Sequence, residues 1–250
     1  MNYIRSISKR KDIWHTLDHY VQDIPSLQSM NSLSLESPVT FFVGENGSGK
    51  STLLEAIAVK YGFNPEGGSK NYSFTTKSTH SSLSDALELI KAPKQAKDGF
   101  FLRAESFYNM ATYMEEVDDD REAGISSRDY LNSYFDGVSP HEQSHGESFL
   151  SLVNNRFWGN GIYILDEPEA ALSPSRQLTL LTYINRLVKQ NSQFIIATHS
   201  PILLAFPQAL IYSFDNQCIK PIAYEETDHY QITRNFLNHP ERMLRILMDE

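Results

Sequence analysis

The sequence predicts an α/β protein with a mostly parallel central sheet, and two observations support this. A short apolar run at residues 39–43 precedes a glycine-rich loop and then a segment of good helix formers. Three further apolar runs, which include Phe100, Ile162 and Phe194, each end in polar residues. Only one cysteine is present, so the fold cannot rest on internal disulfides. Because parallel strands bind ligands at their carboxyl ends, we expect these polar residues to converge at one edge of the sheet.

Length and composition fit one α/β domain, or one domain with a helical sub-lobe. The chain has 250 residues, of which 40% are hydrophobic. The lone Cys218 favours a reducing compartment, which we take to be the cytoplasm. A net charge of −9 argues against strong independent binding to nucleic acid, because phosphate contacts call for a basic surplus. No apolar run is long enough to cross a bilayer.

The glycine-rich loop matches G-x-x-x-x-G-K-[S/T]. Glycines permit backbone angles that let successive N–H groups curl around phosphate oxygens, and the following helix directs its positive end at the same anion. Lys50 adds a positive charge near the β- and γ-phosphates, and Ser51 offers a hydroxyl to Mg²⁺. The candidate phosphate-binding residues are Gly44, Glu45, Asn46, Gly47, Ser48, Gly49, Lys50, Ser51 and Thr52.

The remaining elements follow from apolar spacing. The predicted strands are 3–7 at a sheet edge, 39–43, 99–106, 161–168 and 193–200, with a hairpin over 210–214 and 218–224. The predicted helices are 52–58, 83–90, 107–117, 126–135, 176–190 and 232–248, the last interrupted near Pro240.

Two adjacent carboxylates end one of the buried strands. Successive strand residues point to opposite faces, so Asp166 and Glu167 should have different roles. Asp166 is the candidate for holding Mg²⁺, and Glu167 for polarising a water that attacks a γ-phosphate. His199 ends the next strand and is a candidate for reaching the same phosphate. The alternatives are a turn with two surface acids and a structural histidine.

Residues 141–145 match the zinc-binding pattern H-E-x-x-H, which opens a second hypothesis. Pro140 precedes His141 and Gly146 follows His145, whereas a zinc-binding helix should continue through both histidines. We favour another interpretation, in which Ser144, Gly146 and Glu147 open a helix and form a second anion site. Since the chain already has one phosphate loop, this second site suggests a partner's nucleotide.

Taken together, these motifs resemble the ATP-binding cassette (ABC) family of ATPases, in family order over most of the chain. Residues 44–51 resemble Walker A, residues 162–167 resemble Walker B, and residues 144–147 resemble a divergent signature motif. Residues 171–173 resemble the D-loop, and His199 the switch histidine. The loop sequence and the A-T-H-S-P run resemble more closely the small stand-alone bacterial ATPases of the AAA_21/RecF-like branch.

The resemblance implies a P-loop NTPase fold with a mostly parallel sheet. It implies one domain over residues 1–250, with a helical sub-lobe at about 106–156. It also implies a head-to-tail homodimer that sandwiches two ATP molecules with Mg²⁺. Ser144, Gly146 and Glu147 would then approach the nucleotide held by Lys50 of the other copy. Catalysis would fall to Lys50, Glu167 and His199, with Ser51 and Asp166 on the metal.

The chain also departs from the family pattern. The Q-loop glutamine is absent, and Glu105 is the candidate to replace it near Mg²⁺. The D-loop has Ser173 where an aspartate is usual. The leading hypothesis is a soluble Mg²⁺-dependent ATPase that switches an unidentified protein partner, with a repair or defence role as one option. The alternatives are an ABC transporter subunit and a non-hydrolysing, ATP-gated scaffold for an effector.

Overall fold

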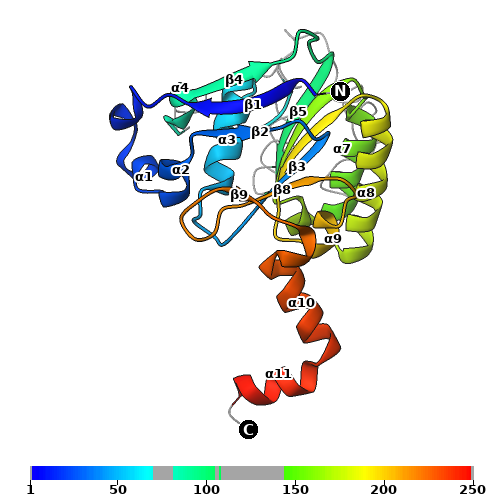
Figure 1. Cartoon of the computed structure of the whole chain (residues 1–250). Helices are drawn as coiled ribbons and strands as arrows, with labels where there is room; N and C mark the ends of the chain where they lie inside the picture. The colour runs from blue at the N-terminus through cyan, green and yellow to red at the C-terminus, as the bar shows by residue number, and fades with distance from the viewer. Residues whose placement is uncertain (1, 70–80, 105–106, 108–143, 249–250) are drawn as a thin grey trace.

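The computed structural model describes residues 2–69, 81–104, 107 and 144–248. Their main sheet has six strands, and helices lie on both of its faces (Figure 1). In spatial order the strands are β5 (Asp98–Arg103), β6 (Gly161–Asp166), β7 (Gln193–Ala197), β3 (Val39–Val43), β8 (Leu210–Ser213) and β9 (Lys220–Pro221). The pairs from β5 to β8 are parallel and the β8–β9 pair is antiparallel, which confirms the predicted α/β class and the C-terminal hairpin.

Helices connect these strands and extend beyond them. In chain order the helices of the described residues are η1 (Trp14–Thr16), α1 (His19–Gln22), α2 (Pro25–Ser29), α3 (Lys50–Tyr61), α4 (Leu83–Ala86), α7 (His145–Arg156), η3 (Pro168–Ala171), α8 (Pro174–Lys189), α9 (Pro201–Leu204), η4 (Tyr224–Glu226), α10 (Asp228–Asn238) and α11 (Pro240–Leu247).

Side chains along the central strands point alternately to the two faces of the sheet, and they contribute to two separate apolar layers. Phe42 and Ile164 belong to the layer that contains α3, whereas Phe41 and Leu165 belong to the layer that contains α7 and α8. All residues of β3, β6 and β7 are buried, as expected for parallel strands that are covered on both faces. This double coverage fixes the strand ends that carry the candidate site.

A second, antiparallel sheet lies on the α3 side, in the order β2 (Ser32–Ser34), β1 (Ile4–Lys9), β4 (Leu87–Lys91). Gln193 joins it to the main sheet, because its buried amide accepts from the N–H groups of Tyr3 and Ile4 at 2.8 and 2.9 Å. The same amide donates to the carbonyl of Leu35 at 3.1 Å. The predicted strand at 3–7 is confirmed as β1, but its predicted edge position was wrong, since β1 is the middle strand of this sheet.

The predicted helix at 83–90 was also wrong in its second half. Residues Leu83–Ala86 form the short α4, and the chain then turns into β4. Strand β4 pairs along β1, with Leu87 opposite Lys9 and Leu89 opposite Ile7. Pairing with a distant strand overrides the local helical spacing here. Apart from Phe107, the helices predicted at 107–117 and 126–135 lie outside the described residues, as does most of the sub-lobe at 106–156.

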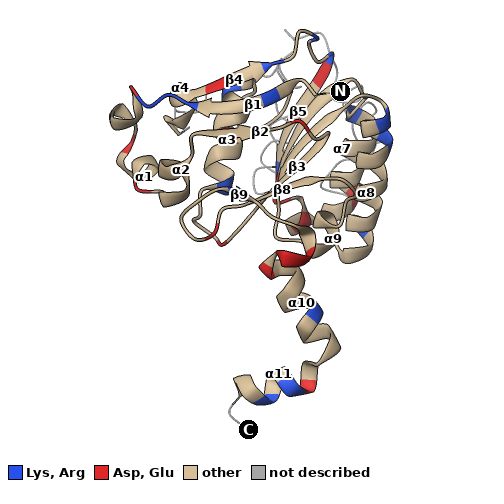
Figure 2. Ribbon diagram, in the orientation of Figure 1, with Lys and Arg blue, Asp and Glu red and all other residues tan. Residues whose placement is uncertain are grey.

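The C-terminal helices α10 and α11 extend away from the body (Figure 1) and have no buried residues. Their break falls at His239, directly before Pro240, which confirms the predicted interruption. Figure 2 shows Lys and Arg of the described residues spread over several elements rather than along one stripe. Within the part of the chain that the structure covers, no helix combines the length and apolarity that a membrane span needs.

Candidate functional site

The glycine-rich loop leaves β3 at Val43 and enters α3 at Lys50, as the sequence predicts. Gly49, the residue before the helix, has a φ of +98°, which a side chain would strain. A Cβ there would also lie 2.7 Å from Cγ2 of Ile24. The hydroxyl of Ser26 donates to the carbonyl of Ser48, so α2 supports the loop from behind. Local backbone and neighbouring packing therefore both require glycine at this turn.

Lys50 folds back over the loop. Its side-chain nitrogen donates to the carbonyls of Gly44 at 2.7 Å and Glu45 at 2.9 Å, and the residue is only 4% exposed. Burial lowers the pKa of Lys50, while the nearby carboxylates of Glu167 and Asp166 act in the opposite direction. The loop thus carries a fixed positive charge at the start of a helix, which is an arrangement that binds phosphate groups.

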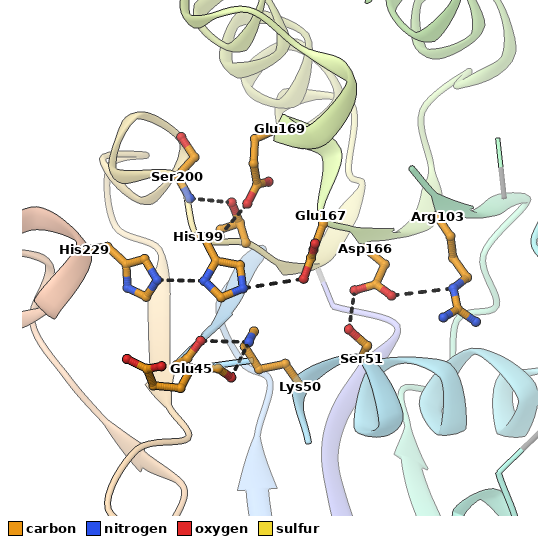
Figure 3. Close-up of polar contacts among 12 residues, drawn as sticks. Glu45, Lys50, Ser51, Arg103, Asp166, Glu167, Glu169, His199, Ser200 and His229 are labelled. Carbon is orange, nitrogen blue, oxygen red and sulfur yellow. Dashed lines mark hydrogen bonds and ion pairs between the residues drawn. The ribbon is translucent and has the colours of Figure 1, made fainter. Parts of the chain in front are cut away.

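Two oxygen-bearing side chains meet where α3 faces the end of β6 (Figure 3). The hydroxyl of Ser51 donates to Oδ1 of Asp166 at 3.0 Å. Arg103, at the end of β5, lies on the other side, with Nε 3.6 Å from Oδ2 of Asp166 and a 2.8 Å ion pair to Glu55. A cavity of about 160 Å³ opens here, lined by Ser51, Arg103, Ala104, Asp166 and Glu167.

The hard oxygen ligands of this cavity fit Mg²⁺, which prefers one or two protein oxygens together with substrate phosphates and water. Ser51 and Asp166 are the described residues that could hold it. The candidate Glu105 lies outside the described residues, so its proposed role stays a prediction. Within the described part of the chain, no group of three or more His, Cys, Asp or Glu side chains forms a protein-only metal cluster.

Glu167 follows Asp166 in a left-handed backbone conformation, with φ of 48° and ψ of 51°. Its N–H donates to the carbonyl of Ala197 at 2.9 Å, so the neighbouring β7 fixes this conformation. A left-handed non-glycine residue is uncommon and costs free energy, and such residues concentrate at functional sites. The turn directs the side chain, which is 35% exposed, away from Asp166 and toward His199 (Figure 3).

His199 follows β7 and contacts groups from three elements. Its Nε2 lies 3.5 Å from Oε1 of Glu167, and its backbone N–H donates to the carboxylate of Glu169. Its Nδ1 lies 2.9 Å from Nε2 of His229, the second residue of α10. Burial lowers the pKa of His199, with further contributions from Lys50 and His229. The imidazole is therefore neutral at pH 7.

Glu169 has a different environment from Glu167 although it is only two residues away. Burial raises its pKa, and its carboxylate holds the backbone N–H of His199. We interpret Glu169 as a support for the turn that presents His199. Sequence reasoning did not distinguish this residue, because its partner is 30 positions away.

The second candidate anion site lies at the start of α7. Ser144 precedes the helix, its hydroxyl bonds to Oε2 of Glu147 at 2.6 Å, and it accepts from Arg176 at 3.0 Å. Arg176 also forms a 2.9 Å ion pair with Glu147. Gly146 packs tightly, since a Cβ there would lie 2.9 Å from the carbonyl oxygen of Ala171. The predicted helix start at Ser144 is confirmed, and it packs against the predicted D-loop segment.

Three of the five residues of the zinc hypothesis, 141–143, lie outside the described residues, so that hypothesis stays untested as a whole. Ser144 has an extended backbone with ψ of 150°, and the helix begins only at His145. A zinc-binding helix would have to continue through Ser144, where the described backbone is extended.

Two residues in the site were not expected from the sequence. Arg103 lay in a predicted strand, and only its register opposite Asp166 brings it to the cavity. His229 belongs to a helix that begins 29 residues after His199, and no local motif connects them. The predicted phosphate-binding residues Gly44 to Thr52 form the loop and the first turn of α3. The predicted acids and histidine, Asp166, Glu167 and His199, lie beside the start of this helix.

Comparisons with known proteins agree with this geometry. A family model described as an AAA domain matches residues 21–129, and one described as an AAA ATPase domain matches residues 153–204. A solved chain of an ABC transporter in an inward-facing conformation superposes with a TM-score of 0.50 at 16% identity, covering 92% of this chain and 88% of that one. The chain has an ABC-type ATPase fold.

Two relatives of this chain show how far the likeness extends. An uncharacterised ABC transporter ATP-binding protein of Haemophilus influenzae is 26% identical over 191 residues, which cover 73% of this chain and 72% of the relative. The macrolide export ATP-binding/permease protein MacB of Campylobacter fetus is 21% identical over 228 residues, or 83% of this chain. This chain matches only 33% of the length of MacB. The narrower RecF-like branch stays a prediction.

Proposed function

We propose that this chain binds ATP with Mg²⁺ at the loop between β3 and α3 and hydrolyses it. The observation that carries the proposal is the meeting of four chemically distinct groups at one sheet edge. These are a buried lysine over a glycine loop, a hydroxyl paired with a carboxylate, a second carboxylate, and a histidine. Phosphoryl transfer needs such positioning and charge stabilisation more than covalent chemistry by the protein.

Each side chain has a role that its contacts support. Lys50 neutralises charge on the β- and γ-phosphates, since its nitrogen is held over the loop by two carbonyls. Ser51 and Asp166 would hold Mg²⁺, which supplies charge neutralisation between the phosphates when it is bound. The candidate Glu105 would face the same ion.

Glu167 is the candidate general base. Its carboxylate is partly exposed and points toward His199, so it can orient and deprotonate a water. His199 faces that carboxylate through its Nε2 and would sense the γ-phosphate. The left-handed turn at Glu167 directs this carboxylate toward His199, whereas Asp166 contacts Ser51, so we assign the metal to Asp166 and the water to Glu167.

We further propose that the site is shared between two copies of the chain in a head-to-tail dimer. Ser144, Gly146 and Glu147 would face the γ-phosphate bound by the other copy. The support is the exposed start of α7, whose side-chain hydroxyl contacts residues of α7 and α8 rather than the phosphate loop. Control of an unidentified protein partner, a repair or defence role, and one domain spanning residues 1–250 remain part of this proposal.

The test is Glu167→Gln, which keeps the size of the side chain and removes the base. We expect ATP turnover to fall by about 100-fold or more, as for loss of a general base, with ATP binding retained. A stable ATP-bound dimer should accumulate in gel filtration with light scattering. Glu88→Gln on the exposed face of β4 is the matched control and should behave as wild type. Unchanged hydrolysis by Glu167→Gln would contradict the assignment.

A second candidate function is the ATP-binding subunit of a transporter. The two relatives described above favour it, because one is named as an ABC transporter ATP-binding protein and the other as a macrolide export ATP-binding/permease protein. Both functions use the same ATP site, so the distinction is the partner. Stable co-purification of the Glu167→Gln chain with an integral membrane protein would support this second candidate over a soluble switch.

A further inference from the structure

Two histidines from distant elements face each other beside the candidate base. Nδ1 of His199 lies 2.9 Å from Nε2 of His229, and the ring centroids are 5.0 Å apart with the planes inclined at 49°. This is hydrogen-bond distance and not a stacked pair. One of the two nitrogens must therefore carry a proton and the other must accept it.

The surrounding charges determine how many protons the pair holds. Lys50 acts on both rings from the phosphate loop, and burial disfavours a charge on either. The acids that oppose these effects are Glu167 beside His199 and Asp215, Asp228 and Glu45 around His229. The pKa values of both histidines are lowered overall, so both rings are neutral at pH 7.5. A neutral pair shares one proton along the 2.9 Å contact.

The position of that proton decides what His199 presents to the candidate base. If His199 donates through Nδ1, its Nε2 is bare and its lone pair faces the carboxylate of Glu167 at 3.5 Å. If His229 donates, His199 carries its proton on Nε2 and presents an N–H to that carboxylate. Only the second arrangement is attractive, because a lone pair facing a carboxylate is repulsive.

We propose that His229 is a positioning residue for His199. Its Nε2–H donates to Nδ1 of His199 and thereby holds His199 in the tautomer whose Nε2–H faces Glu167. Its consequence for turnover rests on the proposed ATP hydrolysis, because that same N–H is the group available to a γ-phosphate oxygen. The tautomer assignment itself does not depend on turnover.

The fold holds His229 firmly enough for this role. The hydroxyl of Thr227 caps the first turn of α10 by accepting from the N–H of Tyr230. Tyr224, just before α10, donates from its hydroxyl to the carbonyl of Pro201 at 3.0 Å and packs on the ring of Tyr230. The first turn of α10 is thus tied to α9, directly after His199, while the rest of α10 extends away (Figure 1).

The first experiment reads the tautomer without ATP. The full chain is labelled with ¹⁵N-histidine and its long-range ¹H–¹⁵N correlations are recorded at pH 7.5. Assignment uses the His199→Gln and His229→Gln variants. We expect His199 to show a protonated Nε2 and a bare Nδ1 in the wild type. A protonated Nδ1 on His199 would overturn the proposal.

The second experiment tests the donor at position 229. His229→Ala removes it, and we expect kcat for ATP to fall about 10- to 100-fold with KM little changed, as when a functional histidine loses its orienting partner. His229→Gln places an amide N–H near the same point and should recover most of that loss. The matched control His239→Gln, at the exposed end of α10, should retain wild-type kcat.

The two experiments separate this proposal from the proposed function. A wild-type chain without ATP turnover contradicts the ATPase proposal, while the correlation spectrum still tests the tautomer. An active wild type in which His229→Ala and His229→Gln lose kcat equally overturns the donor role of His229. Wild-type kcat in His229→Ala would overturn it as well.

Discussion

Two helix starts in this chain have the small and hydroxyl-bearing residues that bind phosphate, yet their surroundings differ. At the start of α3, Gly49 and Lys50 are buried, α2 supports the loop at Ser48, and Ser51 contacts the end of β6. At the start of α7, Ser144 and Glu147 are exposed. The first helix start lies among the acids and histidine of its own chain. The second offers a surface, so its ligand must approach from outside.

The two helix starts also differ in charge. Lys50 gives the α3 loop a fixed positive charge, whereas α7 begins with Glu147, an acid that would repel phosphate by itself. Arg176 pairs with Glu147 at 2.9 Å, and the bond from Ser144 lowers the pKa of that carboxyl. The Arg176–Glu147 pair is then locally neutral, and the positive end of the helix dipole remains the attractive element. This fits a site that assists a nucleotide bound by another copy.

The largest effect should come from the enclosed helix start. We expect Lys50→Ala to lower ATP turnover by at least about 100-fold, because it removes a preorganised positive group from the phosphates. ATP binding should weaken as well, which isothermal titration calorimetry can measure. Lys60→Ala, at the exposed far end of α3, is the matched control and should leave both quantities unchanged. Equal effects of the two variants would contradict a specific phosphate-binding role for Lys50 at the start of α3.

The exposed helix start should show a smaller and different effect. Ser144→Ala removes a hydroxyl that contacts Glu147 and Arg176 at the surface. We expect the free energy of unfolding to change by less than about 1 kcal/mol, as for an exposed hydrogen bond. Turnover should fall about tenfold because the γ-phosphate would lose a donor in a preorganised site.

Chemical denaturation and an ATPase assay measure the two quantities of that prediction. Ser175→Ala, in the exposed first turn of α8, is the matched control. A loss of stability that accounts for the whole loss of turnover would contradict a role for Ser144 in nucleotide contact.

The smallest expected effect is on how the stability of the folded chain changes with pH. The folded-state pKa values of His199 and His229 are lowered, so the folded chain binds fewer protons at these groups than the unfolded chain. Their contribution to stability is complete above the unfolded pKa of about 6.5 and is lost as pH falls toward the lowered folded values. Burial raises the pKa of Glu169, so its effect on the free energy of unfolding is opposite: its contribution to stability increases as the pH falls further.

We therefore expect the melting temperature of wild type to decline between pH 7.5 and 5.5, and that of His229→Gln to decline less steeply. His239→Gln should follow the wild-type curve. Differential scanning calorimetry across this range measures the slopes. Parallel curves for wild type and His229→Gln would contradict a neutral, partly buried histidine pair.

The sequence allowed correct prediction of those parts of the site that are local in the chain. The loop at 44–51, the acids at the end of β6 and the helix start at Ser144 each have a short pattern with a physical cause, and the structure contains them. The parallel sheet followed from buried apolar runs for the same reason. Contacts between residues far apart in the chain could not be predicted from these local patterns. Leu87, predicted in a helix, lies in β4 and pairs with β1. His229 lies beside His199 only because η4 and α10 pack on α9.

The central claim is that one copy's α3 loop and another copy's α7 start form one ATP site. Two inactive variants test it most directly, namely Lys50→Ala and Ser144→Glu, the second placing a negative charge where phosphate should approach. Each alone should hydrolyse ATP poorly. In a mixed dimer, the intact loop of the Ser144→Glu chain meets the intact α7 start of the Lys50→Ala chain, so mixing should restore turnover. A mixture no more active than the sum of its parts, or full activity of Ser144→Glu alone, would contradict the shared site.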